Sequence, residues 1–368
     1  MKILLIGEYS NVHWTLAEGL RSLGHEVCVV SNGDFWKNYK RDISLTRTTY
    51  SKAEGIMFLL KTLATLPKLR NYDVVQLINP MFLELKAERI KPIYRFLKKH
   101  NKKIFLCAFG MDAYWVEAGT RKPHIFRYSD FNIGDKPIIN DYTREQASDW
   151  TDTPKAELNR YIAHDCSGII AGMYEYYRAY IDEHTDKLTY IPFPIEADKH
   201  VAAKLYTNER KLRFFIGIQR TRSIYKGTDI MLRALERIEK DFPNDCEILK
   251  AENVPFEEYS RMVNDCDVLL DQLYGYSPGM NALLAASKGK IVVGGAEEEC
   301  YNILNEEKLR PMVNVIPNED DVYNKLKWLI ENKEIVAKLQ QESVEFVDKH
   351  HSPRKVAKQY LDFWNSRK

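Results

Sequence analysis

The strongest constraint on the fold is a regular alternation of short apolar runs with amphipathic helical stretches. In the first half of the chain, each apolar run has the length and the flanking turn residues of a buried strand, and most runs are separated by a helical pattern. The expected strands span residues 2–7, 25–31, 73–78, 103–108, 168–171 and 188–191. Strands that are apolar on both faces are typical of a parallel sheet covered by helices on both sides.

The alternation restarts after Pro192-Phe193-Pro194. A second series of strands is expected at residues 212–218, 246–251, 267–271, 290–294 and 313–316, again with helices between them. Helical sequence then runs over residues 319–350 and 353–364. We therefore predict an α/β protein with two Rossmann-like, doubly wound parallel-sheet domains.

The length of 368 residues agrees with two domains better than with one core. The Pro-x-Pro segment and the polar stretch after it indicate a hinge. We expect an N-terminal domain of residues 1–194, a C-terminal domain of residues 195–350, and a final helix in residues 351–368 that packs back on the N-terminal domain.

Composition restricts the partners. The 54 Lys and Arg residues nearly balance the 52 Asp and Glu residues, so no overall field favours nucleic acid or a membrane, and any anionic partner must be bound locally. The 6 cysteines form no Cys-x-x-Cys pair and the 9 histidines form no cluster in sequence, so we expect no metal site. The absence of a leader-like or membrane-spanning apolar run leads us to expect a cytoplasmic protein.

Residues 109–161 do not fit the alternation, because they contain many turn residues and isolated aromatic residues. A connection of this length in a compact domain is usually functional or poorly ordered. The aromatic enrichment favours an ordered, functional segment.

The first candidate ligand loop follows the first strand, and it begins at Gly7. It lacks the Gly-x-Gly-x-x-Gly pattern, which disfavours a dinucleotide on this domain. Asn11 and His13 could bind a polar acceptor or a phosphate at the start of the next helix. The alternative is that Asn11 only caps this helix and His13 is a surface residue.

Two loops of the C-terminal domain carry features of a phosphate site. The segment after the strand at 212–218 contains Arg220 and Lys226, which offer a planar fork and a mobile point charge to phosphate oxygens. On spacing alone, a solvated basic loop would be an equal alternative.

The second of these loops precedes a helix of small residues. Gly279 allows a ligand to approach the backbone, and the amides after Pro278 suit a helix N-terminus that binds an anion. The alternative is a simple turn with a helix cap. Two such loops at equivalent strand ends favour a diphosphate site, and its candidate residues are Arg220, Lys226, Tyr276, Ser277, Gly279, Met280 and Asn281.

Over essentially its whole length, the chain resembles the GT-B glycosyltransferases, specifically the retaining family-four group that makes capsule, O-antigen and lipid-linked sugars. The segment at 19–27, Gly-Leu-Arg-Ser-Leu-Gly-His-Glu-Val, looks like a signature of that family, and residues 267–271 and 289–293 look like the strands that flank its donor motif. The resemblance implies two Rossmann-like domains that face each other across a cleft. It also implies transfer of a sugar from a nucleotide-diphosphate donor to a saccharide or lipid-linked acceptor.

The resemblance also assigns roles. Arg220 and Lys226 stand six residues apart, as does the family's pair that neutralises the leaving diphosphate. Asp112 matches the aspartate of the family's His-Gly-x-Asp loop, where it would orient the acceptor or contact the donor sugar; its alternative role is to cap the following turn. Retention of configuration with the diphosphate as base implies that no protein nucleophile, metal or cofactor is needed beyond the nucleotide sugar.

The chain departs from the family at three positions. Tyr276 and Leu284 stand where the family has the carboxylates of its Glu-x7-Glu motif, and Phe109 replaces the histidine of the His-Gly-x-Asp loop. A noncatalytic relative that binds a nucleotide sugar or a glycan is therefore the alternative function. A nucleotide-sugar epimerase is a third and weaker reading, because its expected carboxylates and histidine are missing.

The basic segment from Lys91 to Lys103 is a candidate for contact with anionic lipid at the inner face of a membrane, as in membrane-working relatives. Its alternative role is a solvated helix face.

Overall fold

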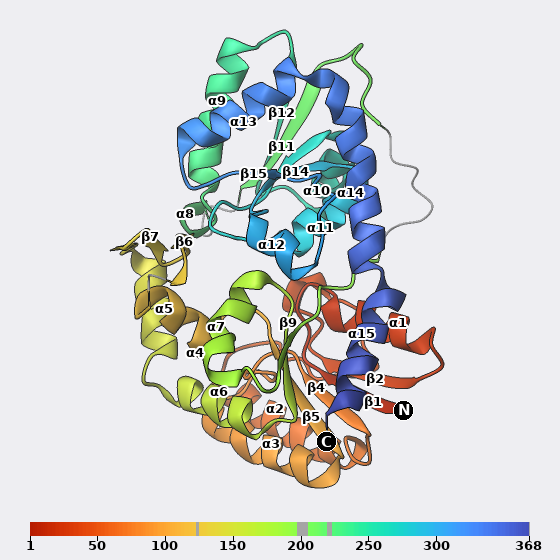
Figure 1. Ribbon diagram of the computed structural model, residues 1–368. Coiled ribbons are helices and arrows are strands. Elements are labelled where there is room, and N and C mark those ends of the chain that lie inside the picture. The colour runs from red at the N-terminus through yellow and green to blue at the C-terminus, as the bar shows by residue number, and fades with distance from the viewer. Residues whose placement is uncertain (123–124, 197–204, 219–222, 368) are drawn as a thin grey trace.

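The computed structural model describes residues 1–122, 125–196, 205–218 and 223–367. It has two lobes, each built on a parallel sheet (Figure 1). This confirms the predicted α/β fold class with two Rossmann-like domains. Most expected strands are present, within one or two residues at each end.

The N-terminal lobe contains a 7-stranded sheet in the order β10-β9-β5-β4-β1-β2-β3, and all its pairs are parallel. The register places Leu4 between Cys28 and Val75. The strands are β1 (Lys2–Ile6), β2 (Glu26–Ser31), β3 (Ile43–Ser44), β4 (Val74–Leu77), β5 (Lys103–Ala108), β9 (Gly168–Ala171) and β10 (Leu188–Tyr190). The helices are α1 (Val12–Arg21), α2 (Lys52–Thr65), α3 (Ala87–His100), α4 (Ala113–Thr120), α5 (Asp141–Trp150), α6 (Pro154–Asp165) and α7 (Tyr174–His184), with short 3₁₀ turns η1 (Phe35–Lys37) and η2 (Leu66–Lys68).

The C-terminal lobe contains a 5-stranded parallel sheet in the order β12-β11-β13-β14-β15. Its strands are β11 (Leu212–Ile218), β12 (Cys246–Glu252), β13 (Val268–Leu270), β14 (Ile291–Gly294) and β15 (Val313–Asn314). Its helices are α8 (Ser223–Lys226), α9 (Thr228–Asp241), α10 (Phe256–Asp265), α11 (Met280–Ser287), α12 (Glu298–Ile303), α13 (Glu319–Glu331) and α14 (Val336–His351), with the 3₁₀ turn η5 (Lys333–Ile335).

Residues 109–161 form ordered structure in the part that is described. Besides α4, α5 and part of α6, they include a small antiparallel sheet of β6 (Tyr128–Ser129), β7 (Asn132–Ile133) and β8 (Lys136–Pro137). We call residues 128–137 the hairpin segment. In Figure 1 it projects from the N-terminal lobe toward α8.

Two chain segments run side by side between the lobes. The amide of Ile195 donates to the carbonyl oxygen of His351 over 2.8 Å, and Nδ1 of His351 lies 2.8 Å from the carbonyl oxygen of Phe193. The chain then continues as α15 (Pro353–Ser366), which packs along α1, so both termini lie in the N-terminal lobe (Figure 1). The last helix is anchored there by the fully buried side chains of Tyr360 and Trp364.

The packing of α15 on α1 depends on Gly19. A Cβ atom at this position would lie 2.3 Å from the carbonyl oxygen of Pro353. Gly19→Ala should therefore lower the free energy of unfolding by about 1–3 kcal/mol through overpacking, measured by urea denaturation. Gly55→Ala is the matched control, since Gly55 is also helical but its Cβ would meet only the Arg47 side chain, at 3.3 Å. The control should be neutral or stabilising by up to about 1 kcal/mol, and equal effects of the two changes would contradict the account.

Candidate functional site

The order of the strands defines where a ligand can reach the C-terminal lobe. The order β12-β11-β13-β14-β15 reverses between β11 and β13, and in open parallel sheets ligands bind at such a reversal, beyond the carboxyl ends of the strands. The segment after β11 leads to Lys226, the last residue of α8. Arg220 lies outside the described residues. The loop after β13 leads to α11, so the two loops expected to bind a diphosphate flank one reversal point.

The N-terminus of α11 presents backbone amides. Gly279 is its N-cap in an extended conformation and has no side chain to cap the first turn, so the amides that begin at Met280 keep the anion-binding character of a helix start. Asn281 is held beside this turn, because its Oδ1 accepts from the Tyr259 hydroxyl at 3.2 Å and its Nδ2 donates to Oδ1 of Asp271 at 3.4 Å.

Tyr276 and Ser277, two of the candidate diphosphate-binding residues, use their backbone amides for contacts within the protein. Both amides donate to Oε1 of Glu175, at 2.5 and 3.0 Å, and Oγ of Ser277 accepts from the amide of Tyr174 at 3.0 Å. Glu175 belongs to the first turn of α7 in the N-terminal lobe. The loop between β13 and α11 is thus bound to the other lobe through its backbone.

The Glu175 carboxylate is buried, and burial raises its pKa while the amide donors oppose the shift. Its second oxygen, Oε2, is buried without a hydrogen-bond partner among the described residues. The amide contacts therefore use only half of this carboxylate.

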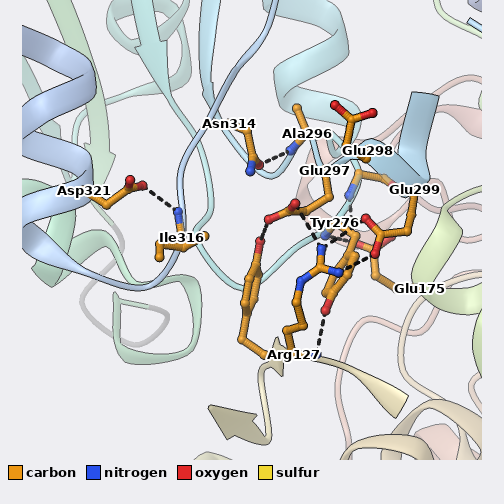
Figure 2. Close-up of polar contacts among 12 residues, drawn as sticks. Arg127, Glu175, Tyr276, Ala296, Glu297, Glu298, Glu299, Asn314, Ile316 and Asp321 are labelled. Carbon is orange, nitrogen blue, oxygen red and sulfur yellow. Dashed lines mark hydrogen bonds and ion pairs between the residues drawn. The ribbon is translucent and has the colours of Figure 1, made fainter. Parts of the chain in front are cut away.

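Arg127 forms a second contact between the lobes (Figure 2). Its amide donates to the hydroxyl of Tyr276 at 2.6 Å, and its guanidinium lies 4.9 Å from the centre of that ring. The guanidinium also pairs with Glu299 at 2.5 and 3.1 Å and with Glu297 at 3.0 Å. The Tyr128 hydroxyl donates to Oε1 of Glu297. The ring and hydroxyl of Tyr276 are therefore occupied by the N-terminal lobe.

A stack of three aromatic rings links the hairpin segment and α5 to α8 at the same boundary. Tyr142 of α5 stacks on Tyr225 of α8 with a ring separation of 4.3 Å and an interplanar angle of 14°, and it also lies over Phe131 at 6.4 Å.

The hairpin segment also brings an acidic residue to this boundary, because Asp130 is in the turn beside Phe131. Burial raises the pKa of Asp130 to about 7, and the nearby charge of Glu175 adds to the shift while Lys226 opposes it.

His13 and Asn11 lie at the carboxyl end of β1. His13 is fully buried, with Nδ1 at 2.8 Å from the carbonyl oxygen of Gly7 and Nε2 at 3.2 Å from Nε2 of Gln76. Burial lowers the pKa of His13 to about 4, so the ring is neutral at physiological pH. The alternative that His13 is a surface residue is wrong, and its ring has no nitrogen free for an acceptor.

Glu8, rather than Asn11, satisfies the first amides of α1. Its two carboxylate oxygens accept from the amides of His13 at 3.1 Å and Trp14 at 2.9 Å. Asn11 has a left-handed backbone with φ 69° and makes no side-chain cap. The Asn11 side chain is half-buried at the strand end, which leaves an acceptor role open to it.

Asp112 is fully buried at the start of α4. Its Oδ1 accepts from the amide of Trp115 at 2.9 Å and its Oδ2 accepts from the Tyr180 hydroxyl at 2.6 Å. Burial raises the pKa of Asp112 to about 6. These contacts give it the helix-capping role that was the alternative reading, and both of its oxygens are engaged inside the lobe.

Three possible metal ligands lie together near the C-terminal end of α7, whereas Glu175 is in the first turn of that helix. They are His164, Glu183 and His184, and the two imidazole rings lie 5.0 Å apart. Nε2 of His184 is bonded to the Tyr114 hydroxyl at 2.7 Å. This group lies away from the two candidate diphosphate loops, and sequence spacing does not reveal it because His164 belongs to α6 whereas Glu183 and His184 belong to α7.

A surface hollow of about 640 Å³ lies at the edge of the C-terminal sheet. It is lined by residues of β15, α13 and α14, among them Asn314 and Trp328. The edge strand β15 is separated from the reversal between β11 and β13 by β13 and β14, and the lining of the hollow contains no residue of the two candidate diphosphate loops. Within the described residues, no helix is both long enough and apolar enough to cross a bilayer.

The sequence matches no protein-family model and no curated protein. Solved structures resemble the chain over its full length. HepE from Anabaena in complex with UDP-glucose has a TM-score of 0.62 at 12% identity, covering 100% of both chains. Sucrose-phosphate synthase from Thermosynechococcus elongatus has a TM-score of 0.61 at 11% identity, covering 100% of this chain and 99% of that one. The chain has the GT-B fold.

The GT-B fold is shared with proteins of other activities. A candidate UDP-N-acetylglucosamine 2-epimerase from Listeria monocytogenes has a TM-score of 0.56 at 12% identity, covering 98% of this chain and 95% of that one. At these identities the likeness establishes the architecture, and the activity has to be argued from the residues of the site.

The hydrogen bond between the Arg127 amide and the Tyr276 hydroxyl can be removed alone. Tyr276→Phe should destabilise the folded chain by about 1 kcal/mol, because a partly buried amide loses its acceptor. The neighbouring Tyr274→Phe is the matched control and should change the urea midpoint little. An equal effect of both changes would show that the cross-lobe bond contributes nothing.

Asp130 should make stability depend on pH. Since its pKa is raised to about 7, the folded chain keeps a proton that the unfolded chain releases above about pH 4, and the free energy of unfolding falls as pH rises between these values. Asp130→Asn should therefore be more stable than the parent by more than about 1 kcal/mol near pH 8, with little difference near pH 4. Asp135→Asn, in the exposed part of the same hairpin segment, is the control and should change stability by less than about 0.5 kcal/mol at either pH. A pH-independent effect of Asp130→Asn would contradict the assignment.

Proposed function

We propose that the chain is a glycosyltransferase that moves a sugar from a nucleoside-diphosphate sugar to a saccharide or lipid-linked acceptor. The observation that carries this proposal is the position of Lys226 and the α11 N-terminus on either side of the strand reversal between β11 and β13. Positive charge and the backbone amides of a helix start at that point fit a diphosphate.

In this proposal the donor diphosphate is held by Lys226, by the amides that follow Gly279, and by Arg220 as the family resemblance implies. As the bond between C1 of the sugar and the phosphate oxygen breaks, its electron pair passes to the diphosphate, where the developing charge is stabilised by these groups. The acceptor oxygen forms the new bond to C1, and its proton passes to the departing diphosphate. This is the retaining, front-face course of the family, and it requires no protein nucleophile, metal or further cofactor.

The N-terminal lobe would supply the acceptor side. Asn11 at the carboxyl end of β1 is the remaining acceptor candidate, because His13 and Asp112 are buried and internally bonded. A role in capsule, O-antigen or exopolysaccharide synthesis, in the cytoplasm at the inner face of the membrane, follows the family resemblance.

A noncatalytic nucleotide-sugar or glycan binder is the second candidate, and one observation favours it. The Tyr276 ring and hydroxyl are engaged by Arg127, so Tyr276 does not replace the sugar-binding carboxylate that the family has at this position. Leu284, at the second carboxylate position, has an exposed apolar side chain. Incubation with nucleotide sugars separates the candidates, since an enzyme releases nucleoside diphosphate and a binder does not. A rearranged donor would instead indicate an epimerase, and the anomeric configuration of a transferred sugar tests retention.

Binding of the diphosphate is tested by calorimetry with UDP, GDP and dTDP. Lys226→Ala should lower the affinity for the tightest-binding of these ligands by roughly 10- to 100-fold, which corresponds to the loss of one charge-assisted hydrogen bond. Lys240→Ala is the matched control, because Lys240 is exposed in the last turn of α9 and away from the two loops. Full affinity in Lys226→Ala, or an equal loss in both variants, would contradict the diphosphate site.

A further inference from the structure

The outward face of α2 is apolar. The side chains of Ile56, Met57, Leu60 and Leu63 are between 45% and 64% exposed, and positions 56, 60 and 63 share one face of the helix. Tyr50, just before the helix, is 75% exposed. Single exposed apolar residues are common on protein surfaces, but a continuous stripe of large ones marks an interaction site. We call these five residues the α2 stripe.

The opposite face of α2 already supplies the core contact. Phe58 and Thr62 are 2% and 1% exposed, and the Thr62 hydroxyl donates to the carbonyl oxygen of Phe58 at 2.8 Å. Ser51 caps the helix by accepting from the amide of Glu54 at 3.2 Å. The helix is thus fixed in orientation by one face, and the α2 stripe is free for a partner.

The charge around the α2 stripe identifies that partner. The stretch that holds α2 and its flanks, residues 47–70, contains five Lys and Arg residues against one Glu residue, a formal charge of +4, whereas the whole chain has +2. Lys52 and Lys61 are exposed on α2 itself. In the part of the chain that the structure describes, no ion pair involves Lys52, Lys61 or Lys68.

We propose that α2 docks on an anionic lipid surface, with the α2 stripe between the headgroups and the acyl chains and the lysines at the lipid phosphates. An apolar face flanked by cations is the pattern of a helix that lies in a membrane interface, and each nearby cation adds about 1 kcal/mol of attraction to an anionic leaflet. A second copy of the chain fits less well, because a symmetric pair would bring two faces of charge +4 together.

The neighbouring helix α3 lacks this combination, although it contains most of the basic segment from Lys91 to Lys103. Its apolar residues, such as Ile90 and Leu97, are buried in the core. Lys98 pairs with Asp165 at 3.4 Å, and Lys91 lies over the Tyr161 ring at 4.6 Å. We therefore assign the lipid contact to α2. In Figure 1, α2 lies in the lower part of the N-terminal lobe, with the C-terminal lobe at the top.

Vesicle flotation tests this proposal on the full chain without any donor or acceptor, so its outcome is separate from that of the proposed transfer reaction. The chain should bind vesicles of phosphatidylcholine with phosphatidylglycerol, and bind pure phosphatidylcholine more weakly. Met57→Glu with Leu60→Glu should lower the partition coefficient at least about tenfold. Ile139→Glu is the matched control, because Ile139 is an equally exposed apolar residue, at 68%, outside the α2 stripe.

A second pair of variants separates the two basic helices. Lys52→Glu with Lys61→Glu should lower binding to the anionic vesicles at least about tenfold, and Arg89→Glu with Lys99→Glu, both exposed on α3, should leave it nearly unchanged. All these positions are exposed, so thermal unfolding should confirm folded variants. The proposal is overturned if the anionic vesicles do not bind, if only the α3 pair lowers binding, or if the chain is a dimer in solution that Leu60→Glu dissociates.

Discussion

The position of the candidate site follows from one topological constraint. Parallel strands need crossover connections, so the loops at the carboxyl ends of a sheet diverge only where the strand order reverses. This happens between β1 and β4 in one lobe and between β11 and β13 in the other. The backbone is open to a ligand at these two points, and Lys226 and Gly279 flank the second of them. The local chemistry of a diphosphate site therefore depends on an order of strands that no local sequence motif specifies.

The contacts that join the lobes differ in strength. The ion pair of Arg127 with Glu299 involves a guanidinium side chain that is 55% exposed, and such exposed pairs contribute at most about 1 kcal/mol. The bonds from the amides of Tyr276 and Ser277 to Glu175 are buried, and leaving a buried donor without a partner costs about 1–3 kcal/mol. Of these two contacts, the one made by Glu175 therefore contributes more to holding the lobes together. Glu175 places a carboxylate from the N-terminal lobe beside the segment in which Tyr276 and Leu284 stand at the positions of the carboxylates of the resembling family.

The sequence predicted most strands because a strand buried on both faces must be apolar throughout. It missed β3, which has only Ile43 and Ser44, and the hairpin segment, whose strands are equally short. Candidate loops could be located from strand ends, but the role of each side chain could not. Glu175 is 101 residues from Tyr276 in sequence, and no local pattern encodes such a pairing. The buried position of His13 could not be predicted locally either, because its Nε2 contacts Gln76 of β4, which is 63 residues away in sequence.

The central claim is that the diphosphate binds between Lys226 and the first turn of α11 while Glu175 continues to hold the loop before it. A crystal structure with the tightest-binding nucleoside diphosphate tests this most directly. The account predicts phosphate oxygens within hydrogen-bond distance of Nζ of Lys226 and of the amides after Gly279, with the amides of Tyr276 and Ser277 still donating to Glu175. A diphosphate that takes these two amides in place of Glu175, or that binds away from the reversal between β11 and β13, would contradict it.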